Sequence, residues 1–157
     1  MNDDVWYFAY GSNLWIDQKE NRTSAIRSGA DRPRIARLAD HRFAFNKRGS
    51  KGQVYANVLP CPGEEVLGVV YRCKQSTVDT MSEYEGGYDR KSVQVIIDDG
   101  SRVEAITYVA MEKNVVDNAR PSYEYLSRIL TGAAQHGLPQ NYIEKIKLLA
   151  SACKGDA

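Results

Sequence analysis

Residues that build metal centres and disulfide frameworks are scarce in this chain of 157 residues. Cys61, Cys73 and Cys153 are an odd number of cysteines with no CxxC pair, so we expect three reduced thiols and no zinc site. His41 and His136 are the two histidines of the chain, and they form no HExxH pattern. The sequence therefore disfavours metal chemistry.

Long apolar runs and an excess of one charge are missing too. The longest apolar runs, such as Val66–Tyr71, are far shorter than a membrane-spanning helix, and Met1–Asp4 lacks the basic and apolar regions of a secretory signal. The formal net charge of +1 gives no general attraction to nucleic acid or anionic membranes. We expect a cytoplasmic protein with no nucleic-acid or membrane partner.

The composition is that of a globular domain, with 43% hydrophobic and 26% charged residues. No repeat or linker divides the chain, so we expect a single domain over residues 1–157, large enough to enclose a pocket. Strand patterns dominate early and helix patterns late, without βαβ alternation. The predicted fold class is α+β, a small and mainly antiparallel β-barrel with flanking helices.

Strands are predicted where apolar residues alternate or run together between turn signals. They are Val5–Tyr10, His41–Asn46, Val54–Leu59, Val66–Tyr71, Lys91–Ile97 and Val103–Val109. The second and third form a hairpin around a Gly-rich loop, and the last two are joined by the turn sequence DDGS. The segment PCPGEE, residues 60–65, is expected to interrupt the strands.

Helices are predicted by apolar residues spaced three and four apart. Residues 15–28 are expected to be partly helical, with a stop at Gly29, and Ser76–Glu85 to form a short helix. A third helix has Pro121 in its first turn and ends at Gly137. The last helix carries one apolar stripe, made of Ile143, Ile146, Leu149 and Ala150.

Glu85 is the candidate acid/base residue. On the predicted helix it shares a face with Val78 and Met81, and it is the last residue before two glycines. An apolar environment and the negative end of a helix dipole both raise the pKa of a carboxyl group, which suits a general base near neutral pH. A plain ion pair between Glu85 and Arg90 or Lys91 is the alternative interpretation.

The stretch YFAYGSNL, residues 7–14, ends a predicted strand in a small polar turn. Such a turn lets backbone N–H groups approach a ligand closely, although an ordinary β-turn explains the sequence as well. It contains neither a Walker A nor a GxGxxG pattern, which disfavours nucleotide phosphate. Ser12 lacks the GxSxG context of a serine nucleophile.

Basic residues gather between Arg32 and Lys51, with Phe43 and Phe45 among them. Charge interleaved with aromatic rings is one way to bind single-stranded nucleic acid. The two phenylalanines also alternate as core-facing strand residues do, so a solvated basic face is the competing interpretation.

Four stretches together resemble the γ-glutamylcyclotransferase family over nearly the whole chain. They are YFAYGSNL, ANVLPCPGEEVLGVVY, EYEGGYDR and PSYEYLSRILTGAAQHGLPQNY, in the family's order and approximate spacing. The resemblance implies a small β-barrel with flanking helices and no metal or cofactor. It implies conversion of a γ-glutamyl-amino acid, a small-molecule substrate, to 5-oxoproline and a free amino acid.

The same resemblance implies the site residues. Glu85 would be the catalytic acid/base, and the substrate-binding residues would be Tyr7, Phe8, Ala9, Tyr10, Gly11, Ser12, Asn13, Tyr88 and Tyr125. Tyr88 follows Glu85 after two residues, a shorter connection than in the animal enzymes. The oligomeric state stays open, with a homodimer among the options.

A γ-glutamyl group carries its own nucleophile, the α-amine, so a single carboxylate can take a proton from that amine and then give it to the leaving amine. The turn at residues 11–12 would bind either the substrate carboxylate or the oxyanion. Two alternatives stay open: a cyclotransferase for γ-glutamyl-amines or other γ-glutamylated metabolites, and a non-catalytic binding module of the same fold.

Overall fold

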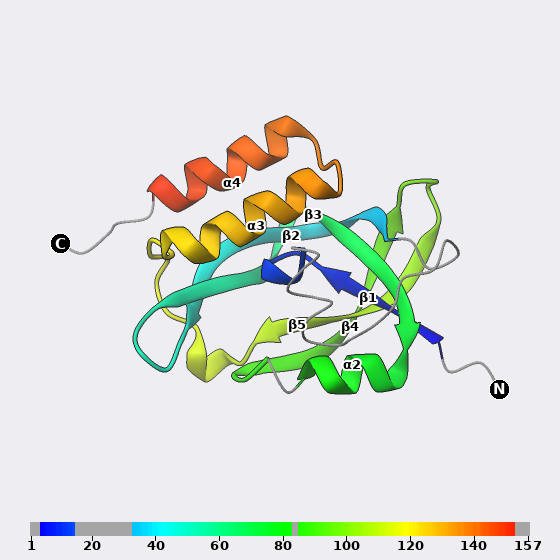
Figure 1. The fold of residues 1–157 in the computed structure, drawn as a ribbon, viewed down its shortest axis with the longest axis horizontal. Coiled ribbons are helices and arrows are strands. Elements are labelled where there is room, and N and C mark those ends of the chain that lie inside the picture. The colour runs from blue at the N-terminus through cyan, green and yellow to red at the C-terminus, as the bar shows by residue number, and fades with distance from the viewer. Residues whose placement is uncertain (1–3, 15–32, 83–84, 153–157) are drawn as a thin grey trace.

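A barrel of β-strands forms the centre of the structure, a computed structural model that describes residues 4–14, 33–82 and 85–152. The strands of these residues are β1 (Asp4–Ala9), β2 (Arg34–Arg48), β3 (Val54–Lys74), β4 (Tyr88–Ile97) and β5 (Arg102–Ala110). They close in the order β1-β3-β2-β4-β5 (Figure 1). Only β1 and β5 pair in parallel among them. The predicted fold class is confirmed.

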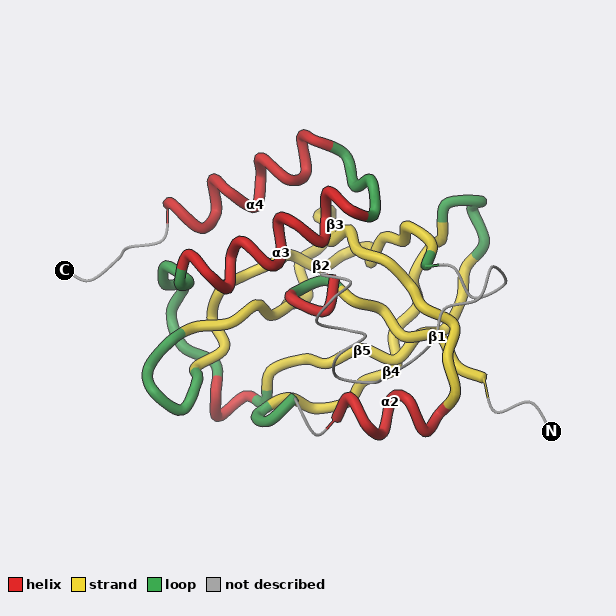
Figure 2. The backbone as a smooth tube through the Cα atoms, viewed as in Figure 1, coloured by secondary structure: helices red, strands yellow, loops and turns green. Residues whose placement is uncertain are grey.

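Helices cover the outside of the barrel. Those of the described residues are α2 (Gln75–Ser82), α3 (Tyr123–Gln135) and α4 (Gln140–Ala152), with 3-10 turns η1 (Ser12–Leu14) and η3 (Glu112–Asn114). Figure 2 shows α3 and α4 together on one side of the yellow strands and α2 on the other. None of the described helices has the length and hydrophobicity needed to cross a membrane. The helix predicted within residues 15–28, and its stop at Gly29, lie outside the described residues.

Strand β1 has a neighbour along each edge, which fixes the place where it ends. Tyr7 pairs with Tyr71 of β3 on one side and with Ile106 of β5 on the other. The backbones pack so tightly that a β-carbon at Gly68 of β3 would collide with the carbonyl oxygen of Ala9. The end of β1, and the turn that follows it, are therefore held firmly by the barrel.

The predicted break at PCPGEE is wrong, because β3 runs through these residues. The strand accommodates them by an irregularity in its partner β2, where the register shifts between Ala39 and His41. Asp40 has a φ of 59°, and its carboxylate accepts a hydrogen bond of 3.0 Å from the N–H of Gly63. A bulge of this kind bends a hairpin without ending it.

The predicted helix ending at Glu85 is also wrong at its end, because the described helix α2 covers Gln75–Ser82 and Glu85 lies outside it. Val78 and Met81 are fully buried, as predicted. Glu85 instead lies in a turn, where its N–H donates to the carbonyl of Ser82 and its carbonyl accepts from the N–H of Tyr88. Since Glu85 is not a helical residue, the turn into β4 positions it, and the argument from a helix dipole does not apply.

The hairpins and the C-terminal helices follow the sequence signals closely. The β2–β3 and β4–β5 pairs are the predicted hairpins. Helix α3 begins after Ser122, whose hydroxyl accepts a hydrogen bond from the N–H of Tyr125, so Pro121 precedes the helix instead of lying in its first turn. Gly137, with a φ of 75°, follows the end of α3 as predicted.

Candidate active site

The site begins where β1 ends and the chain bends at Gly11. The N–H of Leu14 donates to the carbonyl of Gly11 at 3.0 Å, which closes the turn η1. A β-carbon on Gly11 would lie 3.3 Å from the side chain of Ala56 in β3 and 3.5 Å from the hydroxyl of Tyr125 in α3. A side chain at this position would crowd Ala56, so the glycine leaves the backbone of the bend open to a ligand.

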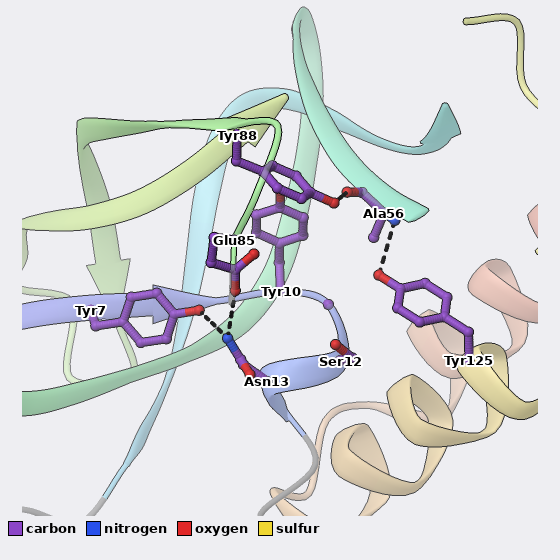
Figure 3. Close-up of a pocket in the computed structure, with 9 residues that line it drawn as sticks. Tyr7, Tyr10, Ser12, Asn13, Ala56, Glu85, Tyr88 and Tyr125 are labelled. Atoms are coloured by element: carbon purple, nitrogen blue, oxygen red, sulfur yellow. Dashed lines mark hydrogen bonds between the residues drawn. The ribbon is translucent and has the colours of Figure 1, made fainter. Parts of the chain in front are cut away.

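Glu85 faces this bend through the side chain of Asn13. The amide nitrogen of Asn13 donates one hydrogen bond of 2.9 Å to Glu85 Oε1 and another of 2.9 Å to the hydroxyl of Tyr7 (Figure 3). Asn13 is 5% exposed, so its amide is fixed by burial. An amide N–H is a charge-assisted donor to a carboxylate, and it fixes where the carboxylate points. Asn13 therefore positions Glu85.

A cavity with about 310 Å³ of empty space, open mouth included, lies between Glu85 and the bend. Its walls come from β1, the bend, β3, the turn before β4 and helix α3 (Figure 3). The predicted site residues that line it are Tyr7, Tyr10, Gly11, Ser12, Asn13, Glu85, Tyr88 and Tyr125. The structure thus brings together residues from both ends of the chain.

Phe8 and Ala9 do not line this cavity. Both are at most 1% exposed and belong to the wall of the barrel, where Phe8 packs near the ring of Tyr10. Ala56 lines the cavity but was not among the predicted site residues. It acts through its backbone, and no side-chain pattern in the sequence reveals such a contact.

Tyr88 and Tyr125 reach the cavity from opposite sides of Ala56. The hydroxyl of Tyr88 donates to the carbonyl of Ala56 at 2.6 Å, and the N–H of Ala56 donates to the hydroxyl of Tyr125 at 3.0 Å. Tyr88 is the first residue of β4, so its short connection to Glu85 still lets it line the same cavity. The backbone of one β3 residue thus orients both rings.

The alternative roles considered for these segments find little support in the geometry. Arg90 pairs with Asp79 at 3.0 Å. Phe43 and Phe45 are buried in the barrel, so their rings are not available to stack on bases. Among the described residues the lining of the cavity contains no histidine that could activate Ser12, and no cluster of His, Cys, Asp or Glu there could hold a metal ion.

Buried tyrosines surround the carboxylate of Glu85. Burial raises the pKa of Tyr7 and of Tyr10 well above the ordinary value of 10, and the negative charge of Glu85 raises both further. Burial also raises the pKa of Tyr88 well above 10. These hydroxyls stay protonated at neutral pH, so they act as neutral hydrogen-bonding groups and not as bases.

The stability of the protein should therefore fall steeply in strong alkali. Below pH 10 Tyr7 and Tyr10 are neutral in both the folded and unfolded chain, and above pH 10 they ionise first in the unfolded chain. Each such group reduces the free energy of unfolding by about 1.4 kcal/mol per pH unit until its folded pKa is reached, so Tyr7, Tyr10 and Tyr88 together contribute roughly 4 kcal/mol per pH unit. Denaturant unfolding between pH 8 and 11.5 measures this slope.

Tyr10→Phe should reduce that alkaline slope by about 1.4 kcal/mol per pH unit, because one of these groups is removed. Ionisation of the folded protein is followed separately by phenolate absorbance. If every tyrosine of the wild type ionised near pH 10 without loss of stability, the burial of Tyr7 and Tyr10 beside Glu85 would be contradicted.

Comparison with known proteins gives a consistent family. A sequence model of the AIG2-like family matches residues 65–146. The human protein "Gamma-glutamylcyclotransferase" is 32% identical over 152 residues, a match that covers 91% of this chain and 77% of the human one. The mouse protein of the same name is also 32% identical, over 154 residues.

A solved structure named "Gamma-glutamyl cyclotransferase" superposes with a TM-score of 0.81 at 28% identity, covering 98% of this chain and 89% of that one. YkqA from Bacillus subtilis superposes with a TM-score of 0.82 at 22% identity, covering 99% of this chain and 57% of its own. The second likeness concerns the fold alone. The likeness to the structure named "Gamma-glutamyl cyclotransferase" relates this barrel to a protein that is named as an enzyme.

Proposed function

The chain belongs to the AIG2-like γ-glutamylcyclotransferase family, and from this membership we propose that it converts γ-glutamyl-amino acids to 5-oxoproline and free amino acids. Its relatives support a cyclotransferase activity. The substrate class and the mechanism given below are proposals. The observation that supports them most is the placement of Glu85, beside Asn13, on the wall of the cavity that also contains Gly11 and Ser12.

The reaction is an internal substitution. The α-amine nitrogen of the γ-glutamyl group attacks the γ-carbonyl carbon, which forms the five-membered lactam, and the bond from that carbon to the nitrogen of the second amino acid breaks. No water is consumed and no enzyme nucleophile is required. The enzyme has to fold the substrate so that the amine meets the carbonyl, and this positioning is a large part of such catalysis.

Glu85 carries the two proton transfers. The carboxylate takes a proton from the α-ammonium group, which gives the amine its lone pair, and the resulting carboxylic acid gives that proton to the departing nitrogen. The second proton, which the attacking nitrogen loses as the lactam closes, ends on the released amine, which leaves as an ammonium group. The residue returns to its starting state after each turnover. Asn13 donates to Glu85 Oε1 and so orients the carboxylate that exchanges these protons.

The bend at Gly11 and Ser12 supplies hydrogen-bond donors at the opposite wall. Its backbone is open because Gly11 carries no side chain, and it lies beside Tyr125 and Ala56. Donors held in place before the reaction stabilise the charge that develops on the carbonyl oxygen. The same donors are suited to the α-carboxylate of the substrate, and either use is compatible with a γ-glutamyl ligand.

Incubation with L-γ-glutamyl-L-alanine tests the function directly. We expect 5-oxoproline and alanine in equal amounts, measured by chromatography against authentic standards. Glutamate in place of 5-oxoproline would mean hydrolysis and would contradict the mechanism. Turnover of γ-glutamyl-ethylamide alone would indicate an enzyme for γ-glutamyl-amines, and binding without any turnover would indicate a binding module.

A further inference from the structure

A second cavity lies beside the first one, since Lys47 of its lining is 5.0 Å from the ring centre of Tyr88, which lines the first. It holds about 1070 Å³ of empty space, open mouth included, and is lined by Lys47, Arg48, Gly49, Ser50, Gly52, Tyr55, Gly86, Gly87 and Asn114. Gly86 follows Glu85 directly in the chain, and Tyr55 precedes Ala56. The two cavities are therefore neighbours, with Glu85 and Ala56 on the wall of the first.

Lys47 is the unusual residue of this second cavity. It is 7% exposed although it carries a charge, and among the described residues its ammonium forms no ion pair with a carboxylate. The nitrogen lies 5.6 Å from the ring centre of Tyr55 and 5.0 Å from that of Tyr88. Cation–π contacts stabilise a buried ammonium only in part, and buried charges are usually paired.

Several features fix Lys47 in this place. The register of β2 against β3 shifts between Phe45 and Lys47, and such irregularities change where a side chain points. A β-carbon on Gly87 would lie 2.7 Å from the lysine nitrogen, so the chain after Glu85 passes directly over it. The carbonyl of Gly87 is held by the side chain of Asn114 at 3.1 Å.

The charge of Lys47 interacts with that of Glu85. Burial lowers the pKa of Lys47 from its ordinary value, and the negative charge of Glu85 opposes that effect. An anion bound beside Lys47 would raise the pKa of the lysine, as Glu85 does, and would offset the cost of burying the ammonium group. The cavity thus combines space, a buried cation and aromatic walls next to the proposed acid/base residue.

We infer that Lys47 binds the carboxylate of the amino acid that leaves, and that the second cavity is the subsite for this half of the substrate. The inference rests on the proposed function. A γ-glutamyl-amino acid has a carboxylate on its leaving half, whereas a γ-glutamyl-amine has none. Lys47 would therefore be the residue that makes the enzyme prefer γ-glutamyl-amino acids.

Lys47→Met tests the inference, because methionine keeps an unbranched apolar stem and removes the charge. Two substrates are compared, L-γ-glutamyl-L-alanine and L-γ-glutamyl-ethylamide, which differs at this position by lacking a carboxylate. For the first substrate we expect KM to rise about 10- to 100-fold, as for loss of a charged hydrogen bond, with kcat little changed. For the ethylamide we expect both constants to stay within about twofold.

Lys51→Met is the matched control, since Lys51 is an exposed lysine in the turn between β2 and β3, four residues from Lys47, and does not line the cavity. It should leave both substrates unaffected. An equal loss on both substrates in Lys47→Met would overturn the subsite, because a merely structural role does not distinguish them. An unchanged KM for γ-glutamyl-alanine would overturn it as well.

A binding measurement separates this inference from the proposed function. Titration of the wild type with L-alanine should shift the backbone NMR signals of Gly87 and Asn114, and titration with ethylamine should not. If neither γ-glutamyl substrate is cyclised but alanine still produces these shifts, the proposed function fails and the carboxylate site stands. If alanine shifts none of these signals, or if the same shifts persist in Lys47→Met, the carboxylate site is wrong. This holds whether or not the protein cyclises the γ-glutamyl substrates.

Discussion

Glu85→Gln is expected to reduce the turnover of γ-glutamyl-alanine by at least about 10³-fold. Glutamine has nearly the same shape but cannot accept a proton from the α-ammonium group or return one to the leaving nitrogen. Positioned acid/base groups contribute about 10²- to 10⁴-fold to a rate, and here one group performs both transfers. The loss should fall on kcat and kcat/KM together, since the proton transfers belong to the transition state.

The matched control for this variant is Glu144→Gln, on the exposed surface of α4, where the carboxylate contacts Lys147 and Gln140. It should retain full activity. Thermal unfolding of Glu85→Gln tests whether the fold is intact. A Glu85→Gln protein that folds and cyclises γ-glutamyl-alanine at the rate of the wild type would refute the role given to Glu85.

Asn13→Asp is expected to reduce activity at pH 7 by about 10- to 150-fold. The variant replaces the N–H that donates to Glu85 by an oxygen, at a place where the two side chains are 2.9 Å apart. A hydrogen bond to a charged group is worth about 1.5–3 kcal/mol, which corresponds to that range of rates. Two carboxylates so close share one proton, which they release only at higher pH.

The pH profile distinguishes this effect from simple damage to the site. In Asn13→Asp the rise of kcat/KM with pH should be displaced to higher pH, because the shared proton must leave before Glu85 acts as a base. Asn118→Asp, an exposed asparagine, should leave both the rate and the profile unchanged. A profile identical to that of the wild type would show that Asn13 does not position Glu85.

Much of this arrangement follows from local sequence signals. The alternating strands around KRGSKGQ and DDGS are hairpins, and Gly137 follows the end of α3. In YFAYGSNL, residues 7–14, the small polar turn after a buried strand indicates a place where the backbone is accessible. Glu85 and Tyr125 are far apart in the chain, and the resemblance to the family, more than any periodicity, predicts that they share one cavity with the turn.

Other features depend on contacts that a linear pattern does not contain. PCPGEE predicts an interruption of the strand, but β3 continues through it because the partner strand β2 has a bulge at Asp40. Glu85 is not part of the predicted helical face, because this residue belongs to the turn that leads into β4. In the sequence Lys47 is one of several positive charges in a basic segment. Its burial follows from the shifted register of β2 and from the position of Gly87 next to its ammonium group, and neither is visible in the sequence.

A crystal structure of Glu85→Gln with L-γ-glutamyl-L-alanine bound is the most direct measurement of the central claim. We expect the γ-glutamyl group in the first cavity, with its α-amine within about 2.6–3.2 Å of the side chain at position 85, a distance that proton transfer requires. An oxygen of this group should accept a hydrogen bond from the backbone N–H of Gly11 or Ser12. A γ-glutamyl group bound outside this cavity, or an α-amine that points away from position 85, would contradict the account.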